Sequence, residues 1–481
     1  MAVLKKQMPD PTLIIQMQRM GDLVMSFPLM AWLRTIEPER PVWVVAEPRF
    51  FQALMPFAPQ VVFFAPETAP RLRATRFYRV INLSHRPEAL QLAGALETEL
   101  RFGAFGDAEG AHIRGDWQLY RASIVHNNRH NRLHWADLAA LDAVPAACLP
   151  HTLWPRPRVP GAQGRLGLFV GASEEAKRPD AIFWAELARQ LIRRDHNPVF
   201  LGGPEDRPLA TEAARRAGIP RSNLAGVFSL EKFADFIRQL DLLVTPDTGP
   251  MHVGAWMQAP TLCLSMGPVN PWETAPSPPG HLVLRAEPSC AGCWRCTRLT
   301  ADGTPPCHAA FIPGRIAALI QAALHGKADR LHTPGLRLLR TARDDRGLFT
   351  LHQADSKAPR PRDLRGALWR EAFLALFGGP QHRLPQAVEA LRRDNPQTLA
   401  LLARCASTLI RRLAAAGREA ARTPGPRRGQ TCGQPLWLSV PPLLRPFSGY
   451  LQLEMENAGY SRQSWERALT LTRTLLDSIA R

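Results

Sequence analysis

The segment Thr245-Pro-Asp-Thr-Gly-Pro-Met-His252 places a carboxylate, a hydroxyl and an imidazole where a buried strand meets a helix. The free backbone N–H groups at the start of that helix, together with the Thr248 hydroxyl, would form a pocket suited to phosphate. His252, about one turn into the helix, could donate a hydrogen bond to the same anion. Alternatively, Asp247 and Thr248 only cap the helix and His252 packs against it.

A second candidate is Asp22, in the segment Gln18-Arg-Met-Gly-Asp22 that follows the first expected strand. Gly21 permits a tight turn, and Asp22 then lies at the start of the next helix, where the helix dipole favours the ionised carboxylate. An ionised carboxylate that faces a cleft between domains could act as a general base. In the simpler interpretation, Asp22 is only a first-turn helix residue.

Two further loops follow strands in the second half of the chain. Val170-Gly-Ala-Ser-Glu-Glu-Ala-Lys177 ends in a lysine whose compact ammonium could neutralise a diphosphate, although it could also be a solvated loop lysine. Gly202-Gly-Pro-Glu-Asp206 carries Glu205, which could accept hydrogen bonds from a ribose or serve as an acid at the start of a helix.

Four cysteines lie close together with the spacing C-x2-C-x2-C-x10-C, and His308 follows the last of them. Four thiolates at such spacing can hold zinc or an iron–sulfur cluster. Otherwise they are packed thiols near the cleft. The cysteines are Cys290, Cys293, Cys296 and Cys307.

These motifs follow short apolar runs, which are the expected strands. The runs alternate with helical patterns, which is typical of parallel sheets covered by helices. This alternation of strands and helices occurs twice, before and after a Pro- and Gly-rich stretch at 150–164 that resembles a linker. Two doubly wound domains are therefore expected, with ligands beyond the carboxyl ends of the strands or between the domains. The expected strands are 12–17, 42–46, 61–64 and 80–83, then 166–170, 198–201, 241–245 and 260–264.

The domain boundaries follow from these two series of alternating strands and helices. We predict an amino-terminal Rossmann-like domain over 1–155 and a second Rossmann-like domain over 165–330. Beyond about residue 330 the strand signal disappears. Residues 331–481 are predicted to form a basic, mainly helical extension with a mobile loop near 422–445.

Composition excludes several classes of protein. The 481 residues are 45% hydrophobic and 21% charged, which excludes a wholly disordered chain and a small disulfide scaffold. The net charge is +18, of which residues 331–481 carry +12, and such an excess suggests an anionic neighbour such as nucleic acid, a phosphorylated glycolipid or a membrane surface. Neither a membrane-spanning segment nor a signal peptide is evident, so we expect a soluble cytoplasmic protein.

Taken together, the motifs resemble glycosyltransferase family 9, the ADP-heptose:lipopolysaccharide heptosyltransferases, over roughly residues 12–325. Several motifs in the right order are more specific than any one of them. The resemblance is carried by Ile14–Pro28, by Gly171-Ala-Ser173 with Lys177, by Gly202–Asp206, by Leu224-Ala-Gly226 with Asp241–His252, and by Ala259-Pro-Thr261 with Gly267–Pro271.

The resemblance implies an α/β protein of the GT-B type, in which two Rossmann-like doubly wound domains face a cleft, here with the helical extension added. It implies an inverting, metal-independent transfer of a heptose or a related sugar from an ADP-sugar to a lipopolysaccharide core or lipid A precursor. No cofactor would be required. Such an enzyme would be cytoplasmic and peripheral at the inner face of the cytoplasmic membrane.

The resemblance also assigns roles by position. Asp22 matches the proposed catalytic base, Glu205 the ribose contact, and Phe228 an apolar side chain against adenine. The other matches hold the nucleotide sugar, chiefly its diphosphate: Ser173, Lys177, Asp247, Thr248, Gly249 and His252.

Three features depart from the family pattern. The cysteine cluster at 290–307 resembles clusters in only part of the family. Arg178-Pro-Asp180 replaces the aromatic residue often found after the lysine, and the extension beyond about 330 has no counterpart. The alternative function is a non-catalytic protein that binds a membrane or nucleic acid through the basic extension. Few aromatics and no recognition motif occur there, which argues against nucleic acid.

Overall fold

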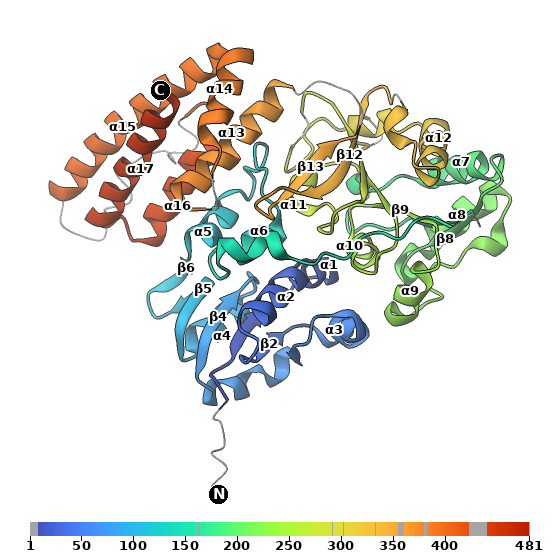
Figure 1. The fold of residues 1–481 in the computed structure, drawn as a ribbon, viewed down its shortest axis with the longest axis horizontal. Helices are drawn as coiled ribbons and strands as arrows, with labels where there is room; N and C mark the ends of the chain where they lie inside the picture. The colour runs from blue at the N-terminus through green and yellow to red at the C-terminus, as the bar shows by residue number, and fades with distance from the viewer. Residues whose placement is uncertain are drawn as a thin grey trace, which may run out of the picture.

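The computed structural model describes residues 8–161, 164–290, 292–301, 303–331, 333–354, 360–379, 382–422 and 440–480. These residues form two α/β units side by side and a group of helices at one end (Figure 1). The predicted α/β class, with two Rossmann-like units in the GT-B arrangement and a helical extension, is confirmed by the two sheets and their helices.

The first unit is built on a six-stranded sheet in the order β3-β2-β1-β4-β5-β6. All neighbours are parallel except β6, which returns antiparallel to β5 as a hairpin. The strands are β1 Thr12–Ile15, β2 Val42–Val45, β3 Val62–Phe64, β4 Phe77–Asn82, β5 Thr98–Asp107 and β6 Gly110–Arg114. The α-helices are α1 Met20–Met25, α2 Phe27–Ile36, α3 Pro48–Leu54, α4 Pro87–Ala95, α5 Asp116–Ser123 and α6 Trp135–Ala140.

The second unit has a seven-stranded sheet in the order β13-β12-β11-β10-β9-β7-β8. Its central strands are continuous apolar runs because helices cover the parallel part of the sheet on both faces. The strands are β7 Arg165–Phe169, β8 Asn197–Leu201, β9 Leu242–Pro246, β10 Thr261–Ser265, β11 Leu282–Ala286, β12 Leu336–Arg343 and β13 Phe349–Gln353. The α-helices are α7 Ala181–Ile192, α8 Arg207–Ala217, α9 Leu230–Ile237, α10 Gly249–Trp256, α11 Pro271–Thr274 and α12 Pro313–Leu324.

The expectation that strands end near residue 330 is wrong. β12 pairs antiparallel with β11, and β13 pairs antiparallel with β12, so the second sheet continues to Gln353. Arginines interrupt the apolar pattern of β12: Arg337 lies between the buried Leu336 and Leu338, and it is buried itself. A buried arginine in a strand hides the alternation of apolar and polar residues on which strand prediction depends.

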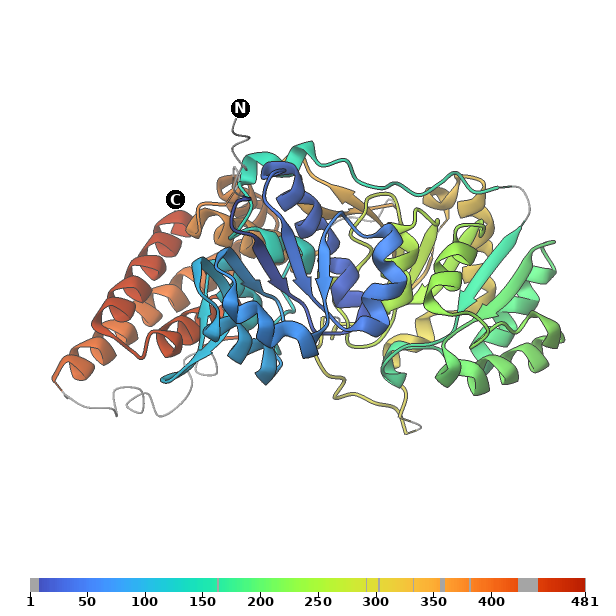
Figure 2. The same ribbon diagram turned by 90° about the horizontal axis from the view of Figure 1, so that it is seen from below.

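A linker without regular secondary structure follows residue 151 and runs along one side of the molecule to β7 (Figure 2). This agrees with the Pro- and Gly-rich linker that the sequence predicts at 150–164. Residues 162 and 163 of it lie outside the described residues.

The helical extension packs on the first unit, next to α5 and β6, although the chain enters it from the second sheet (Figure 1). Most of the loop predicted near 422–445, residues 423–439, lies outside the described residues. No helix in the described part of the chain is both long and apolar enough to cross a membrane. The helices are α13 Pro361–Leu376, α14 Leu384–Asp394, α15 Pro396–Arg422, α16 Arg445–Asn457 and α17 Arg462–Ala480.

Candidate functional site

The two strongest sequence motifs meet where the units touch. A Cβ atom on Gly21 of α1 would lie 3.2 Å from Cδ2 of His252 and 3.3 Å from Cα of Gly249, both in α10. Only glycine allows the two helices to approach this closely without a shift of the backbone. The contact brings the end of β1 in the first unit next to the end of β9 in the second.

A cleft of about 760 Å³ opens beside this contact. Both units contribute to its lining, as expected for the carboxyl ends of parallel strands at a junction between domains. Three of the predicted site residues line it: Asp22 from the first unit, and Lys177 and Asp247 from the second. The structure therefore gathers the predicted base and two of the predicted donor contacts in one cavity.

Asp22 lies in the first turn of α1, where the backbone N–H of Arg19 donates to its Oδ2 at 3.2 Å. Burial raises the pKa of this carboxyl above its ordinary value, and the positive charges of Arg121 and Arg19 oppose the rise. A raised pKa makes the Asp22 carboxylate a better proton acceptor than an exposed aspartate.

Asp247 directly follows β9, and its Oδ2 accepts a hydrogen bond from the Thr274 hydroxyl. Burial raises the pKa of Asp247; Thr274, Lys177 and Arg285 oppose the rise, and the nearby Asp22 carboxylate adds to it. The negative charge of Asp22 therefore reaches Asp247 across the cleft. Like charges at one site tend to push pKa values upward, which favours uptake of a proton.

Lys177 is half-buried at the cleft, and its Nζ lies 2.7 Å from Oε1 of the exposed Glu174. Since Glu174 also lines the cleft, the ammonium is held in place while it faces the cavity. An ammonium of this kind is a point charge that can be shared with an incoming phosphate.

The helix start at Thr248 supports the anion-binding interpretation over simple capping. Thr248 is the N-cap of α10 in an extended conformation, yet its side chain makes no capping hydrogen bond. The Asp247 carboxylate is instead bonded to Thr274. Pro250 has no N–H, and the Met251 N–H donates to the Thr248 carbonyl at 3.1 Å, which leaves the Gly249 N–H as the donor at this helix start.

His252 is buried in α10 and faces the contact with α1. Its Nδ1 atom has no hydrogen-bond partner among the described residues. Burial lowers the pKa of His252 to about 3, and His134 contributes to this shift, so the imidazole is neutral at physiological pH. Its expected contact with a diphosphate remains a prediction.

The structure does not bring the remaining predicted residues into the cleft. Ser173 and Glu205 are exposed, and Phe228 stacks on Phe236 with ring centroids 4.8 Å apart. The Glu205 turn and the Phe228 segment do lie together, because the Gly226 N–H donates to the Gly202 carbonyl at 2.9 Å. Their predicted contacts with ribose and adenine would place the nucleoside beyond β8, outside the cleft.

Sequence reasoning missed Glu273, a buried carboxyl in α11 that also lines the cleft. The side-chain amides of Asn128, Asn131 and Asn270 donate to it at 2.6, 2.9 and 3.4 Å. Burial raises the pKa of Glu273 to about 7, although these amides oppose the rise. Asn128 and Asn131 belong to the first unit, so Glu273 joins the two units, and no local pattern in the sequence signals a pairing over this distance.

The four clustered cysteines are half-buried in the loop after β11. Burial raises the pKa of the Cys293 thiol, and the other three cysteines raise it further, so the four lie near one another. Within the described ranges, however, no group of three or more His, Cys, Asp or Glu side chains is arranged to hold a metal ion. The residues as placed do not fit the zinc or iron–sulfur site, which remains a prediction.

A known protein family matches the part of the chain that forms most of the second unit. The model of "Glycosyltransferase family 9 (heptosyltransferase)" matches residues 146–300. Because they match this family model, residues 146–300 are called the family 9 segment. This family 9 segment contains Lys177 and the whole turn from Asp247 to His252, whereas Asp22 and the helical extension lie outside it.

Two curated relatives match a similar stretch. Lipooligosaccharide heptosyltransferase 2 of Haemophilus influenzae is 31% identical over 132 residues, which cover 26% of this chain and 37% of the relative. Lipopolysaccharide heptosyltransferase 2 of Salmonella typhimurium is 34% identical over 125 residues, which cover 25% and 36%. The chain thus matches little more than a third of the length of these relatives.

Two solved structures of glycosyltransferases are also similar to this chain. The E. coli ADP-heptose lps heptosyltransferase II has a TM-score of 0.49 at 21% identity, with 66% of this chain and 99% of that chain covered. The iron-containing dodecameric glycosyltransferase TibC from enterotoxigenic E. coli has a TM-score of 0.40 at 15% identity, with 66% and 76% covered.

Proposed function

We propose that the protein is an inverting, metal-independent glycosyltransferase. It moves a heptose or a related sugar from an ADP-sugar to a lipopolysaccharide core or lipid A precursor. The observation that carries this proposal is the shared cleft, in which Asp22 of the first unit faces Lys177 and Asp247 of the family 9 segment. The heptosyltransferase names of the matched relatives support the choice of donor and acceptor.

In the proposed reaction, Asp22 acts as the general base. Its carboxylate removes the proton from an acceptor hydroxyl as the hydroxyl oxygen attacks the anomeric carbon of the donor. The bond between that carbon and the diphosphate oxygen breaks, its electron pair leaves with ADP, and the anomeric configuration inverts. The raised pKa of Asp22 matches this role, because a stronger base takes up the proton more readily.

The family 9 segment would stabilise the leaving ADP. Lys177 supplies positive charge, and the Gly249 N–H at the start of α10 supplies a hydrogen bond, where negative charge develops on the diphosphate. Ser173, Thr248, Gly249 and His252 complete the donor contacts, and Asp247 orients this turn through Thr274.

The acceptor places the enzyme at a membrane surface. We propose a cytoplasmic enzyme that is peripheral at the inner face of the cytoplasmic membrane, where the net charge of +12 on residues 331–481 would favour anionic lipids. Nucleic acid is not a proposed partner. Metal analysis of the purified protein tests whether Cys290, Cys293, Cys296 and Cys307 hold a structural metal despite their present arrangement.

The decisive experiment compares Asp22→Asn with the unchanged protein. ADP-heptose and other ADP-sugars are offered with the lipid acceptor, transfer is measured, and the product's anomeric configuration is read by NMR. Loss of a general base lowers kcat by roughly 10²- to 10⁴-fold. Donor binding should remain, since the carboxamide keeps the shape of the cleft.

Asp235→Asn is the matched control, because Asp235 is an exposed aspartate on α9 away from the cleft. It should transfer sugar like the unchanged protein. Undiminished turnover by Asp22→Asn would remove the base assignment. Transfer with retained configuration would contradict direct attack.

A further inference from the structure

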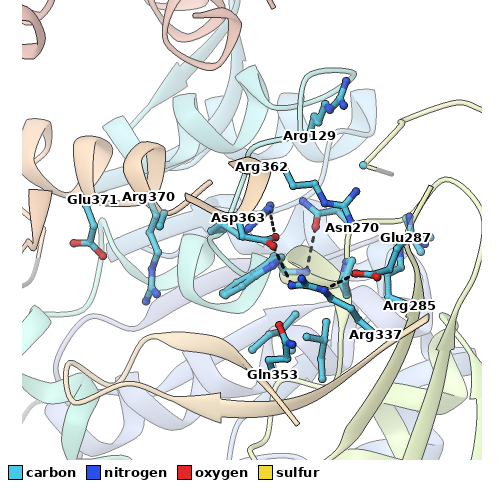
Figure 3. A pocket seen from close by; sticks show the side chains of 18 residues that line it. Arg129, Asn270, Arg285, Glu287, Arg337, Gln353, Arg362, Asp363, Arg370 and Glu371 are labelled. Atoms are coloured by element: carbon cyan, nitrogen blue, oxygen red, sulfur yellow. Dashed lines mark hydrogen bonds and ion pairs between the residues drawn. The ribbon is translucent and has the colours of Figure 1, made fainter. Parts of the chain in front are cut away.

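A second cavity, the arginine pocket, lies beside the cleft and encloses about 290 Å³ (Figure 3). Val269 and Asn270 line both cavities, so the two are neighbours. The pocket is walled by β11–β13, the start of α13 and the loop after α5. Its lining includes six arginines: Arg129, Arg132, Arg285, Arg337, Arg362 and Arg370.

Ion pairs balance only part of this charge. Three carboxylates line the pocket, and each is paired with at least one arginine, which fixes the junction between α13 and its neighbours. The pairs are Arg337 with Asp363 at 3.0 Å and with Glu287, Arg132 with Asp363 at 3.6 Å, Glu371 with Arg346 at 2.8 Å, and Arg370 with Asp344 at 2.8 Å.

Among the described residues, the other three guanidinium groups have no carboxylate partner in an ion pair. Arg129, Arg285 and Arg362 donate to backbone carbonyl oxygens at 2.9, 2.7 and 3.3 Å, and none forms an ion pair with a carboxylate of the described residues. Figure 3 shows these three side chains around the same cavity, from three different segments. The pocket therefore holds an excess of positive charge.

Two of these side chains have pKa values that are lowered because their charged form is partly removed from water. Arg285 is only 7% exposed, and burial lowers its pKa. Burial also lowers the pKa of Arg362, and the charges of Arg337 and Arg129 add to that shift although Asp363 opposes it. A buried cation that forms no direct ion pair is unfavourable, and an anion in the pocket would offset this cost.

We propose that the arginine pocket binds a phosphate group on the acceptor saccharide while the acceptor hydroxyl lies at Asp22. Planar guanidinium groups match phosphate oxygens with paired hydrogen bonds, and three unbalanced charges suit a dianion. This inference rests on the proposed function. Lys177 and the start of α10 already account for the phosphates of the donor, so the anion bound here is a different one.

The test uses the full chain with Arg129→Gln and Arg362→Gln. Neither residue belongs to the ion pairs at the junction of α13, so the fold should remain. Arg404→Gln is the control, because Arg404 is an exposed arginine on α15. One series measures the rise in Tm with inorganic phosphate against chloride at equal ionic strength. The other compares kcat/KM for the phosphorylated acceptor and for the same acceptor after phosphatase treatment.

With the phosphorylated acceptor, each variant should lose roughly ten- to a hundred-fold in kcat/KM, mainly through a higher KM. The KM for the donor and the rate with the dephosphorylated acceptor should not change. Inorganic phosphate should raise the Tm of the unchanged protein and of Arg404→Gln, and raise it less in the two pocket variants.

Three outcomes would overturn the inference. Equal losses with both acceptors, or no loss with either, show that the pocket does not recognise the acceptor phosphate. A Tm effect without any acceptor effect shows a site for free phosphate only. If the unchanged protein transfers no sugar at all, the proposed function and the acceptor role both fail, and the phosphate series then decides separately whether the pocket binds this anion.

Discussion

The first α/β unit has two interfaces that differ in character. Around the candidate site, the interface with the second unit consists of glycine and polar groups: Gly21 meets Gly249, and Asn128 and Asn131 hold Glu273. The same interface also includes the ring pair of Phe27 and Trp256, with centroids 5.4 Å apart. Against the helical extension the first unit presents aromatic rings. Those rings are Trp117 and Tyr120 of α5. Tyr120 contacts Phe373 of α13 with centroids 4.3 Å apart, and Trp117 contacts Phe377, directly after α13, with centroids 5.1 Å apart.

The interface with the second unit is therefore expected to allow motion, whereas the interface with the helical extension is expected to stay closed. Polar interfaces between domains of one chain resemble those of transient complexes, whereas a large apolar interface behaves like a core that has been cut in half. The candidate site lies at the polar interface. The extension, despite its charge of +12, is therefore in the first place a structural part of the amino-terminal unit.

Phe373, which is fully buried, gives the strongest test of the aromatic interface. Phe373→Ala should lower the free energy of unfolding by about 3–5 kcal/mol, because it removes a ring from the aromatic interface and leaves a cavity. Calorimetry should show a lower Tm. Leu401→Ala, at a leucine that is 38% exposed on α15, is the control and should change the Tm little. An unaltered Tm in Phe373→Ala would mean that this interface is not a core.

Glu273 allows a test of the interface between the two α/β units through the pH dependence of stability. Its pKa of about 7 lies above the ordinary value of 4.5, so between these pH values the native state keeps a proton that the unfolded state releases. The contribution of this group to stability therefore falls as pH rises from about 4.5 to about 7, by at most about 3 kcal/mol.

Glu273→Gln removes this titration while it keeps an oxygen for the asparagine amides. The Tm of the variant relative to the unchanged protein should therefore be higher at pH 8 than at pH 5, measured by thermal unfolding at both values. Glu231→Gln, an exposed site in the first turn of α9, should show the same difference at both pH values. A difference for Glu273→Gln that does not depend on pH would contradict the raised pKa.

The smallest effect is expected for Gly21→Ala. The new methyl group would meet Gly249 Cα at 3.3 Å, so α1 and α10 must shift by a few tenths of an ångström. Alanine also favours the helix by about 0.5–1 kcal/mol, so the Tm should change little. The shift should lower kcat by about three- to ten-fold, because catalysis depends on sub-ångström placement.

Gly314→Ala on α12 provides the matched glycine, because only Gln190 Cδ, at 3.9 Å, would lie near its methyl group. Full activity is expected there. If both variants behave alike in the transfer assay, the contact between α1 and α10 does not position the site.

Much of the fold could be predicted from the sequence, because parallel strands such as β9 and β10 are continuous apolar runs that end in turn residues. The mainly helical character of the extension was also predicted, and α13–α17 form it. The β12–β13 hairpin was not, since Arg337 and Arg340 interrupt its pattern. Antiparallel strands at the edge of a sheet carry weaker signals than buried parallel ones.

The candidate site was predictable where a motif lies directly at the end of a strand. Asp22 and Asp247 are such cases, and the cleft contains both. Glu273 and the arginine pocket were not predictable, because their partners come from the loop after α5 and from α13, far away in the sequence. Ser173, Glu205 and Phe228 lie outside the cleft, so the sequence motif did not reveal how far the donor site extends.

The aromatic interface also has a consequence for synthesis. Trp117 and Tyr120 leave the ribosome long before α13 and α16 are made, a delay of roughly 10–50 s at the usual rates of translation. During that time the first unit presents a row of uncovered rings, and the second unit can fold before the first is complete. The newly made chain would therefore benefit from a chaperone that binds apolar surface until α13 arrives.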